Sequence, residues 1–169
     1  TGRIDIGLEP VGNSQAVAIN GNGQVVGTSE RFEFVELDGT LQPFYIPHAF
    51  VWDTSNGIRE LGSLGGQFTF AKAINNVGQV VGYGDLASGH ERAFIWDEQE
   101  GMRELPTLNG GETRAIAVND LGQVLVAESE LGTYIWNPTN EISLVPIGGF
   151  TINNLEQIVG GTVGDPSIW

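Results

Sequence analysis

One ten-residue pattern, Ala-Ile-Asn-x-x-Gly-Gln-Val-Val-Gly, occurs twice almost unchanged in this chain and twice more in altered form. The four copies occupy residues 18–27, 73–82, 117–126 and 151–160. A repeat at this spacing predicts a stack or ring of similar structural units. The repeat therefore constrains the fold of this chain more than any other feature of its sequence.

Two more signals accompany the repeat. A tryptophan follows each copy, and these positions account for all four tryptophans of the chain: Trp52, Trp96, Trp136 and Trp169. A segment such as 57–62 (Gly-Ile-Arg-Glu-Leu-Gly) follows each of the first three tryptophans, but none follows the fourth. Residues 2–7 (Gly-Arg-Ile-Asp-Ile-Gly) have the same character. The piece that the last unit lacks therefore stands at the start of the chain.

Each unit predicts four short strands, because its segments are rich in β-branched and aromatic residues and are bounded by Asn, Asp, Gly and Pro. The Asn-x-x-Gly inside the repeat, as at residues 20–23, predicts a hairpin turn between the first two strands. We interpret the repeated asparagine first as a turn residue and only second as a ligand.

Four-stranded units repeated at this length are typical of β-propeller blades. The sequence thus predicts an all-β, four-bladed β-propeller with four strands per blade, closed by the N-terminal strand joining the last blade. The 169 residues form one domain in this interpretation. Its parts are residues 1–8 as the outer strand of blade 4, 16–62 as blade 1, 71–106 as blade 2, 115–146 as blade 3, and 150–169 as the inner three strands of blade 4.

Composition narrows the classes of partner. The formal net charge is -14, and the 21 acidic residues are scattered with no basic stripe among them, which argues against nucleic acid as a partner. The chain has no cysteine, so disulfides and thiolate metal sites are excluded. No apolar run is long enough to span a membrane.

The tripeptide His48-Ala49-Phe50, which follows Gln24-Val25-Val26-Gly27, resembles the bacterial extracellular repeat named HAF. The resemblance extends over nearly the whole chain, in two strong and two degraded copies. It implies a secreted or surface-associated bacterial protein and implies no reaction. We expect any secretion leader to lie outside this sequence, which begins at Thr1.

Catalytic groups are scarce. His48 and His90 are the only histidines, and no cluster of ligands has the spacing that a metal site needs, so we expect no metal and no cofactor. Glu60 and Glu104 share a repeat position, each beside an arginine, and we interpret them as exposed surface. The sequence therefore predicts a protein that is not an enzyme, and a glycan-active hydrolase is the interpretation it favours least.

One connection breaks the repeat. The connection formed by residues 28–47 is about twice as long as the equivalent connections of the other units. Its alternating apolar and acidic residues before the Asp38-Gly39 turn predict an extended hairpin. We expect this hairpin to share one face of the ring with the loops that join the blades. The candidate ligand-binding residues on that face are Phe32, Phe34, Phe44, Tyr45, Asn13, Gln67, Asn109 and Glu112.

These features favour a binding or adhesion module outside a bacterial cell. Its ligand would be a glycan or a protein, since aromatic rings beside amide groups match the apolar face and the hydroxyls of a sugar. The alternative is a structural or assembly scaffold without a ligand. We expect a monomer, or a homo-oligomer in which the first strand completes a neighbouring molecule.

Overall fold

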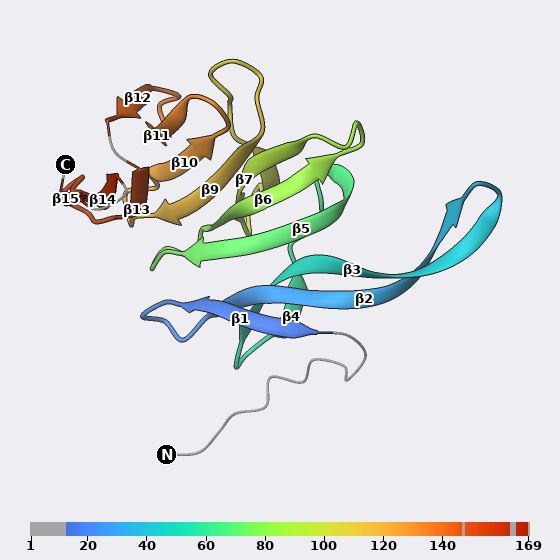
Figure 1. Ribbon diagram of the computed structural model, residues 1–169. Coiled ribbons are helices and arrows are strands. Elements are labelled where there is room, and N and C mark those ends of the chain that lie inside the picture. The colour runs from blue at the N-terminus through green and yellow to red at the C-terminus, as the bar shows by residue number, and fades with distance from the viewer. Residues whose placement is uncertain (1–12, 147, 163–164, 169) are drawn as a thin grey trace.

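The computed structural model describes residues 13–146, 148–162 and 165–168, and these form strands and turns with no helix. The predicted all-β class is confirmed. The strands form four antiparallel sheets, in which each strand pairs with its neighbours in the chain (Figure 1). Sheet 1 holds β1 (Ser14–Ile19), β2 (Val25–Leu37), β3 (Thr40–Asp53) and β4 (Gly57–Glu60); sheet 2 holds β5 (Gly65–Ile74), β6 (Val80–Leu86), β7 (Glu91–Asp97) and β8 (Gly101–Glu104); sheet 3 holds β9 (Thr113–Val118), β10 (Val124–Glu128), β11 (Gly132–Trp136) and β12 (Ile142–Val145); sheet 4 holds β13 (Gly148–Ile152), β14 (Ile158–Thr162) and β15 (Asp165–Ile168).

The first turn of sheets 1 to 3 is the predicted Asn-x-x-Gly hairpin, and in sheet 4 Glu156 takes the place of the glycine. In sheet 2 the Gly78 N–H donates to the carbonyl of Asn75 at 3.2 Å, and the Asn75 N–H donates to the carbonyl of Gln79 at 3.1 Å. Gly78 has a φ of 88°, which glycine adopts without the steric penalty that a Cβ would bring. The prediction that these segments are turns is therefore confirmed.

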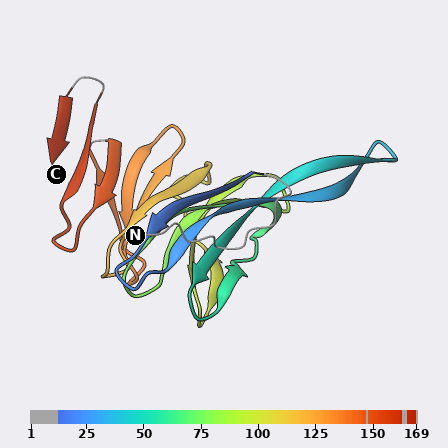
Figure 2. The same ribbon diagram turned by 90° about the horizontal axis from the view of Figure 1, so that it is seen from below.

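The four sheets follow one another in chain order, face against face (Figure 2). β3 packs against β5, β7 against β9, and β10 against β13. At the first of these interfaces Val26 and Val51 of sheet 1 meet Phe94 of sheet 2, and each of the three is at most 1% exposed. The apolar core thus consists of layers between consecutive sheets, and each layer stabilises the stack by removing apolar surface from water.

The repeated asparagine joins consecutive sheets. Its Nδ2 donates to the backbone carbonyl of the same asparagine in the next sheet at 2.9 Å, from Asn20 to Asn75, from Asn75 to Asn119, and from Asn119 to Asn153. In all four sheets the Nδ2 also donates to the Oε1 of the glutamine four residues later, at 2.6–2.8 Å. We call this series of bonds the asparagine ladder. It fixes the first turn of each sheet against the first turn of the next.

A second row of bonds runs beside the ladder. The Asn76 N–H donates to Oδ1 of Asp120 at 2.8 Å, and the Asp120 N–H donates to Oδ1 of Asn154 at 2.8 Å. The backbone and side-chain hydrogen bonds from Asn76 lower the pKa of Asp120, and a further bond from the side chain of Asn154 lowers it too. The Asp120 carboxylate is therefore charged at neutral pH and holds three sheets together at their turns.

The described residues do not form a closed ring. Sheet 4 has three strands where each other sheet has four, and it lies at the far end of the row from sheet 1 (Figure 1). Residues 1–8, predicted to supply the missing strand, lie outside the described residues. The coarse prediction of four repeated β units is confirmed, and closure of the ring stays a prediction.

We expect Asn75→Ala to lower the free energy of unfolding by about 2–4 kcal/mol, because it removes three hydrogen bonds of a side chain that is only 4% exposed. The control is Asn109→Ala, which removes a single side-chain bond in an exposed loop and should cost less than about 1 kcal/mol. Urea unfolding followed by tryptophan fluorescence measures both. Equal costs would mean that the ladder contributes nothing beyond an ordinary turn.

Candidate binding surfaces

The long connection of the first unit is an extended hairpin, as predicted. β2 and β3 pair without interruption from Val25 opposite Trp52 to Leu37 opposite Thr40. Asp38 and Gly39 form the turn with φ values of 51° and 74°, and two positive φ values are typical of the tight type I′ hairpin turn. The outer ends of β2 and β3 project beyond the rest of sheet 1 and away from the other three sheets (Figure 1).

The register divides the four predicted aromatic residues between two faces of the hairpin. Tyr45 lies directly opposite Phe32, and Phe34 is two residues further along β2, so these three share one face. The Phe32 ring meets the rings of Phe34 and Tyr45 edge to face, with centroids 5.2 and 5.6 Å apart. Phe44 pairs with Glu33 and lies on the other face. We call Phe32, Phe34 and Tyr45 the aromatic face.

The four polar candidates are distributed over three sheets. The Asn13 N–H donates to a carboxylate oxygen of Glu30 at 3.0 Å, at the base of the hairpin. Gln67 is exposed on β5. The Asn109 N–H donates to Glu128 at 3.1 Å, and the Glu112 carbonyl accepts the N–H of Ser129 at 2.9 Å. Asn13, Asn109 and Glu112 are thus tied to their own sheets, and the structure does not gather the four around the aromatic face.

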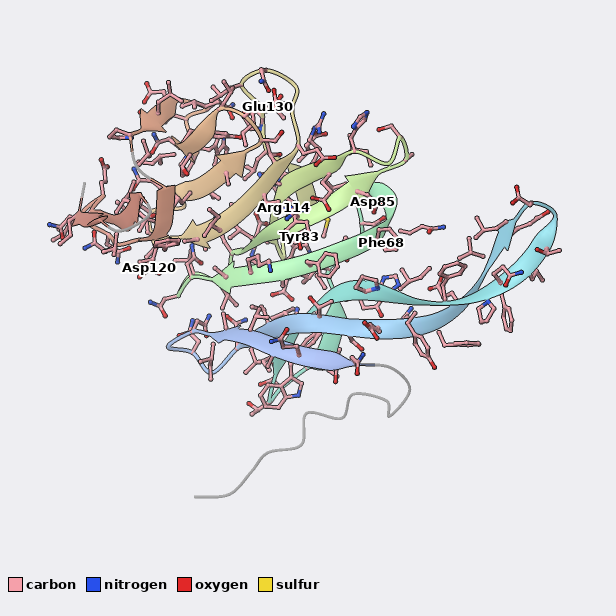
Figure 3. All side chains as sticks on the ribbon, in the orientation of Figure 1. Phe68, Tyr83, Asp85, Arg114, Asp120 and Glu130 are labelled. Atoms are coloured by element: carbon pink, nitrogen blue, oxygen red, sulfur yellow. The ribbon has the colours of Figure 1, made fainter. Side chains whose placement is uncertain are left out.

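A cationic and aromatic cluster joins sheets 2 and 3 (Figure 3). The guanidinium carbon of Arg114 lies 4.7 Å from the centre of the Tyr83 ring, and Nε of Arg114 donates to Glu91 at 2.6 Å. The Tyr83 ring stacks on Phe70, with centroids 5.0 Å apart. Arg114 on β9 therefore contacts two strands of the preceding sheet, and we interpret this cluster as a support for sheet packing.

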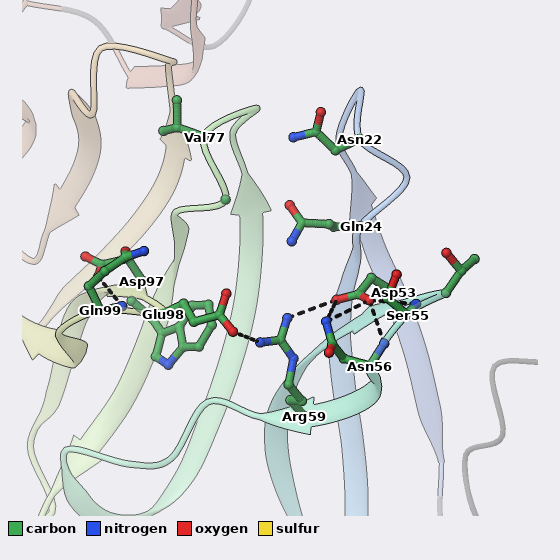
Figure 4. Close-up of a pocket in the computed structure, with 13 residues that line it drawn as sticks. Asn22, Gln24, Asp53, Ser55, Asn56, Arg59, Val77, Asp97, Glu98 and Gln99 are labelled. Carbon is green, nitrogen blue, oxygen red and sulfur yellow. Dashed lines mark hydrogen bonds and ion pairs between the residues drawn. The ribbon is translucent and has the colours of Figure 1, made fainter.

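Two pockets that the sequence analysis missed lie between consecutive sheets, at the end of the sheets that is opposite the projecting hairpin. Intersheet pocket 1 has a volume of about 410 Å³ and lies between sheets 1 and 2 (Figure 4). Intersheet pocket 2 has a volume of about 550 Å³ and lies between sheets 2 and 3. They are lined by equivalent residues of the repeat: Gln24, Asp53, Arg59 and Trp96 in pocket 1, and Gln79, Asp97, Arg103 and Trp136 in pocket 2.

Each pocket contains a charged pair held by a turn. Asp53 accepts the backbone N–H groups of Ser55 and Asn56. The side chain and backbone of Asn56 lower the pKa of Asp53, so its carboxylate is charged at neutral pH. Arg59 donates to Asp53 at 3.0 Å and to Glu98 of sheet 2 at 2.6 Å, so that its guanidinium spans pocket 1 from one sheet to the next (Figure 4).

Pocket 2 repeats the pair with one difference. Arg103 donates to Asp97 at 2.5 Å and pairs with Glu100 of the same turn. Both partners belong to sheet 2, so the Arg103 guanidinium does not span pocket 2 to sheet 3 as Arg59 spans pocket 1. The repeat positions of Asp53 with Asp97, and of Arg59 with Arg103, are visible in the sequence and could have indicated these pockets. From the sequence, the segment that holds each arginine was interpreted only as exposed surface.

The described residues contain no group of three or more His, Cys, Asp or Glu side chains arranged to hold a metal ion. None of their elements is a helix with the length and apolarity that crossing a membrane requires. Comparisons with protein-family models and with curated proteins find no match to this chain.

Shortening the hairpin separates a structural role from a binding role. We expect replacement of residues 32–45 by Asn-Gly, which joins the paired residues Arg31 and Ile46 by a tight turn, to change the melting temperature by less than about 4 °C. The reason is that Ile46, at 1% exposed, stays in place, whereas most of the removed side chains are exposed. Circular dichroism during heating measures the change. A much larger fall would mean that the hairpin stabilises the sheets.

Proposed function

We propose that this protein is a non-enzymatic binding module whose aromatic face holds a glycan or a protein partner. The observation that carries the proposal is the exposure of that face: Phe32, Phe34 and Tyr45 are 45%, 61% and 54% exposed on one side of a projecting hairpin. Large aromatic side chains are enriched at the centres of binding interfaces, because each removes much apolar surface from water at a low cost in side-chain entropy.

The position of the aromatic face adds support. Phe34 and Tyr45 are each more than half exposed, so a partner can contact them without moving the core. Tyr45 also carries a hydroxyl that can donate or accept a hydrogen bond at the edge of an apolar contact. Such a surface suits the ring of a sugar or an apolar segment of a protein.

The location outside a bacterial cell is part of the same proposal. It rests on the resemblance of residues 48–50 and of the preceding repeat to the HAF repeat. A surface with a net charge of -14 stays soluble and repels nucleic acid, which agrees with a partner that is neutral or positively charged.

Combining Phe34→Ala with Tyr45→Ala tests the aromatic face. A glycan array first identifies a bacterial or host glycan that the unaltered protein binds. We expect the double variant to bind that glycan with an apparent affinity at least about tenfold lower. The matched control is Phe44→Ala, which removes an exposed aromatic ring from the other face of the same hairpin. Equal binding by the double variant, the control and the unaltered protein would exclude the aromatic face as the site.

The exposed face of sheet 4 favours a second candidate function, that of an assembly unit. Val159 is 45% exposed, whereas Val26, Val81 and Leu125 at the same repeat position are fully buried by the next sheet. Ile168 is 74% exposed, whereas the equivalent Val51, Ile95 and Ile135 are at most 5% exposed. A face built like three buried ones is suited to take another sheet.

We infer that sheet 1 covers this face and that residues 1–8 add a fourth strand beside β15, which closes a four-bladed propeller within one chain or between two copies. Gly21 offers no side-chain oxygen to Asn154, so closure would depend on the apolar faces and on the asparagine ladder.

If the ring closes, Asn153 meets the backbone carbonyl of Asn20, and Asn153→Ala should then destabilise the protein by about the same 2–4 kcal/mol as a ladder asparagine inside the row. Unfolding in urea measures it. A cost below about 1 kcal/mol would contradict closure, because Asn153 would then bond only within its own turn, to Gln157 and Leu155.

A further inference from the structure

The geometry points to intersheet pockets 1 and 2 as two equivalent binding sites, each for a neutral saccharide residue. These sites are at the opposite end of the sheets from the aromatic face, and they share with the proposed function only the class of ligand. Each pocket is lined by a glutamine that occurs at the same position in every repeat.

The amide of this glutamine is oriented by the asparagine ladder. Oε1 of Gln24 accepts the Nδ2 of Asn20 at 2.7 Å, and Oε1 of Gln79 accepts the Nδ2 of Asn75 at 2.7 Å. Both glutamines line their pockets, and the Nε2 of each has no hydrogen-bond partner among the described residues. Each pocket therefore offers a fixed amide group with two unused donors.

The third interface shows what such an amide binds when a partner is present. Nε2 of Gln123 donates to Oδ1 of Asn137 at 2.7 Å and to Oε1 of Glu156 at 2.9 Å. Asn137 stands where the other two units have an aspartate of the pocket, and Glu156 stands where the other three turns have glycine. At this interface the chain itself supplies two oxygen atoms to the glutamine.

Glu156 takes this position against a local penalty. Its φ is 62°, in the left-handed region that a residue with a Cβ rarely adopts. The equivalent Gly78 faces Gln24, and the equivalent Gly122 faces Gln79. Glycine has no side chain, so neither position supplies an oxygen to its glutamine. By this comparison, a ligand of pockets 1 and 2 is expected to bring each glutamine the oxygen acceptor that Glu156 brings to Gln123.

The other groups of the pockets select the kind of oxygen. A hydroxyl can accept from Gln24 Nε2 and at the same time donate to the Asp53 carboxylate, which an ether or a carbonyl cannot do. Trp96 lines the same pocket and offers an apolar surface to the C–H groups of a sugar ring. Because Asp53 and Glu98 outnumber Arg59, the pocket disfavours a phosphate, a sulfate or a carboxylate. The volumes of both pockets lie in the range of small-molecule sites.

The test titrates the full chain with neutral sugars, namely the methyl glycosides of glucose, galactose, mannose and N-acetylglucosamine, by isothermal calorimetry and by amide NMR shifts. We expect at least one of them to bind at two sites per chain. Gln24→Glu should weaken the pocket 1 site, and Gln79→Glu the pocket 2 site, each by at least about tenfold. Each change keeps the oxygen that accepts from the ladder asparagine and removes both donors.

Two further variants control for folding and position. Gln157→Glu makes the same exchange in the fourth repeat and should leave both sites intact, because its Oε1 likewise serves only Asn153. Gly78→Glu places a glutamate beside Gln24, as Glu156 lies beside Gln123, and should block sugar binding in pocket 1 alone. A Cβ at Gly78 would lie 3.6 Å from Oε1 of Gln24, which is ordinary van der Waals contact. If Gly78→Glu does not fold, the glutamine variants decide the result.

The proposal is overturned if none of these sugars binds, or if Gln24→Glu and Gln79→Glu bind as the unaltered protein does. Repeating the titration with the shortened hairpin separates the two proposals. Retained sugar binding supports the pockets whatever the fate of the aromatic face, and loss of sugar binding in that variant alone assigns the sugar to the hairpin and overturns the pocket sites.

Discussion

The asparagine ladder is the interaction on which the rest of this structure depends. A single side chain closes its own turn by accepting the N–H of the glutamine four residues later, orients that glutamine, and reaches the next sheet. Buried amide groups are costly when unpaired, so a sheet that shifted against its neighbour would lose several bonds at once. The apolar layers between sheets supply most of the stabilisation, and the ladder determines the position at which those layers meet.

The ladder also has a direction, and the two ends of the row consequently differ. Every ladder bond between sheets runs from the side chain of an earlier asparagine to the backbone carbonyl of a later one. Sheet 4 therefore ends with a donor, Asn153, and with an apolar face on Val159 and Ile168 that no described sheet covers. Sheet 1 offers the matching acceptor, the backbone carbonyl of Asn20. An array built this way can continue only by adding a sheet in one order, whether that sheet comes from the same chain or from another copy.

The sequence allowed much of the fold to be predicted and little of the candidate pockets. The Asn-x-x-Gly turns, the four units and the hairpin with its Asp38-Gly39 turn depend on local chemistry, which a single sequence displays. The cross-sheet role of Asn75 depends on how sheets stack. The separation of Phe44 from the aromatic face follows only from the strand register. The free amide of Gln24 became informative when Gln123 was seen with both of its donors satisfied.

Hydrogen exchange of asparagine side-chain amides, followed by NMR, tests the ladder most directly. If the ladder holds the sheets, the Nδ2 protons of Asn20, Asn75 and Asn119 exchange much more slowly than those of Asn109, which donate to no described residue. Slow exchange at all three positions, lost together when the sheets unfold, is the expected result. Exchange of the Asn75 and Asn119 side chains as fast as that of Asn109 would contradict it, because the sheets would then be held without these bonds.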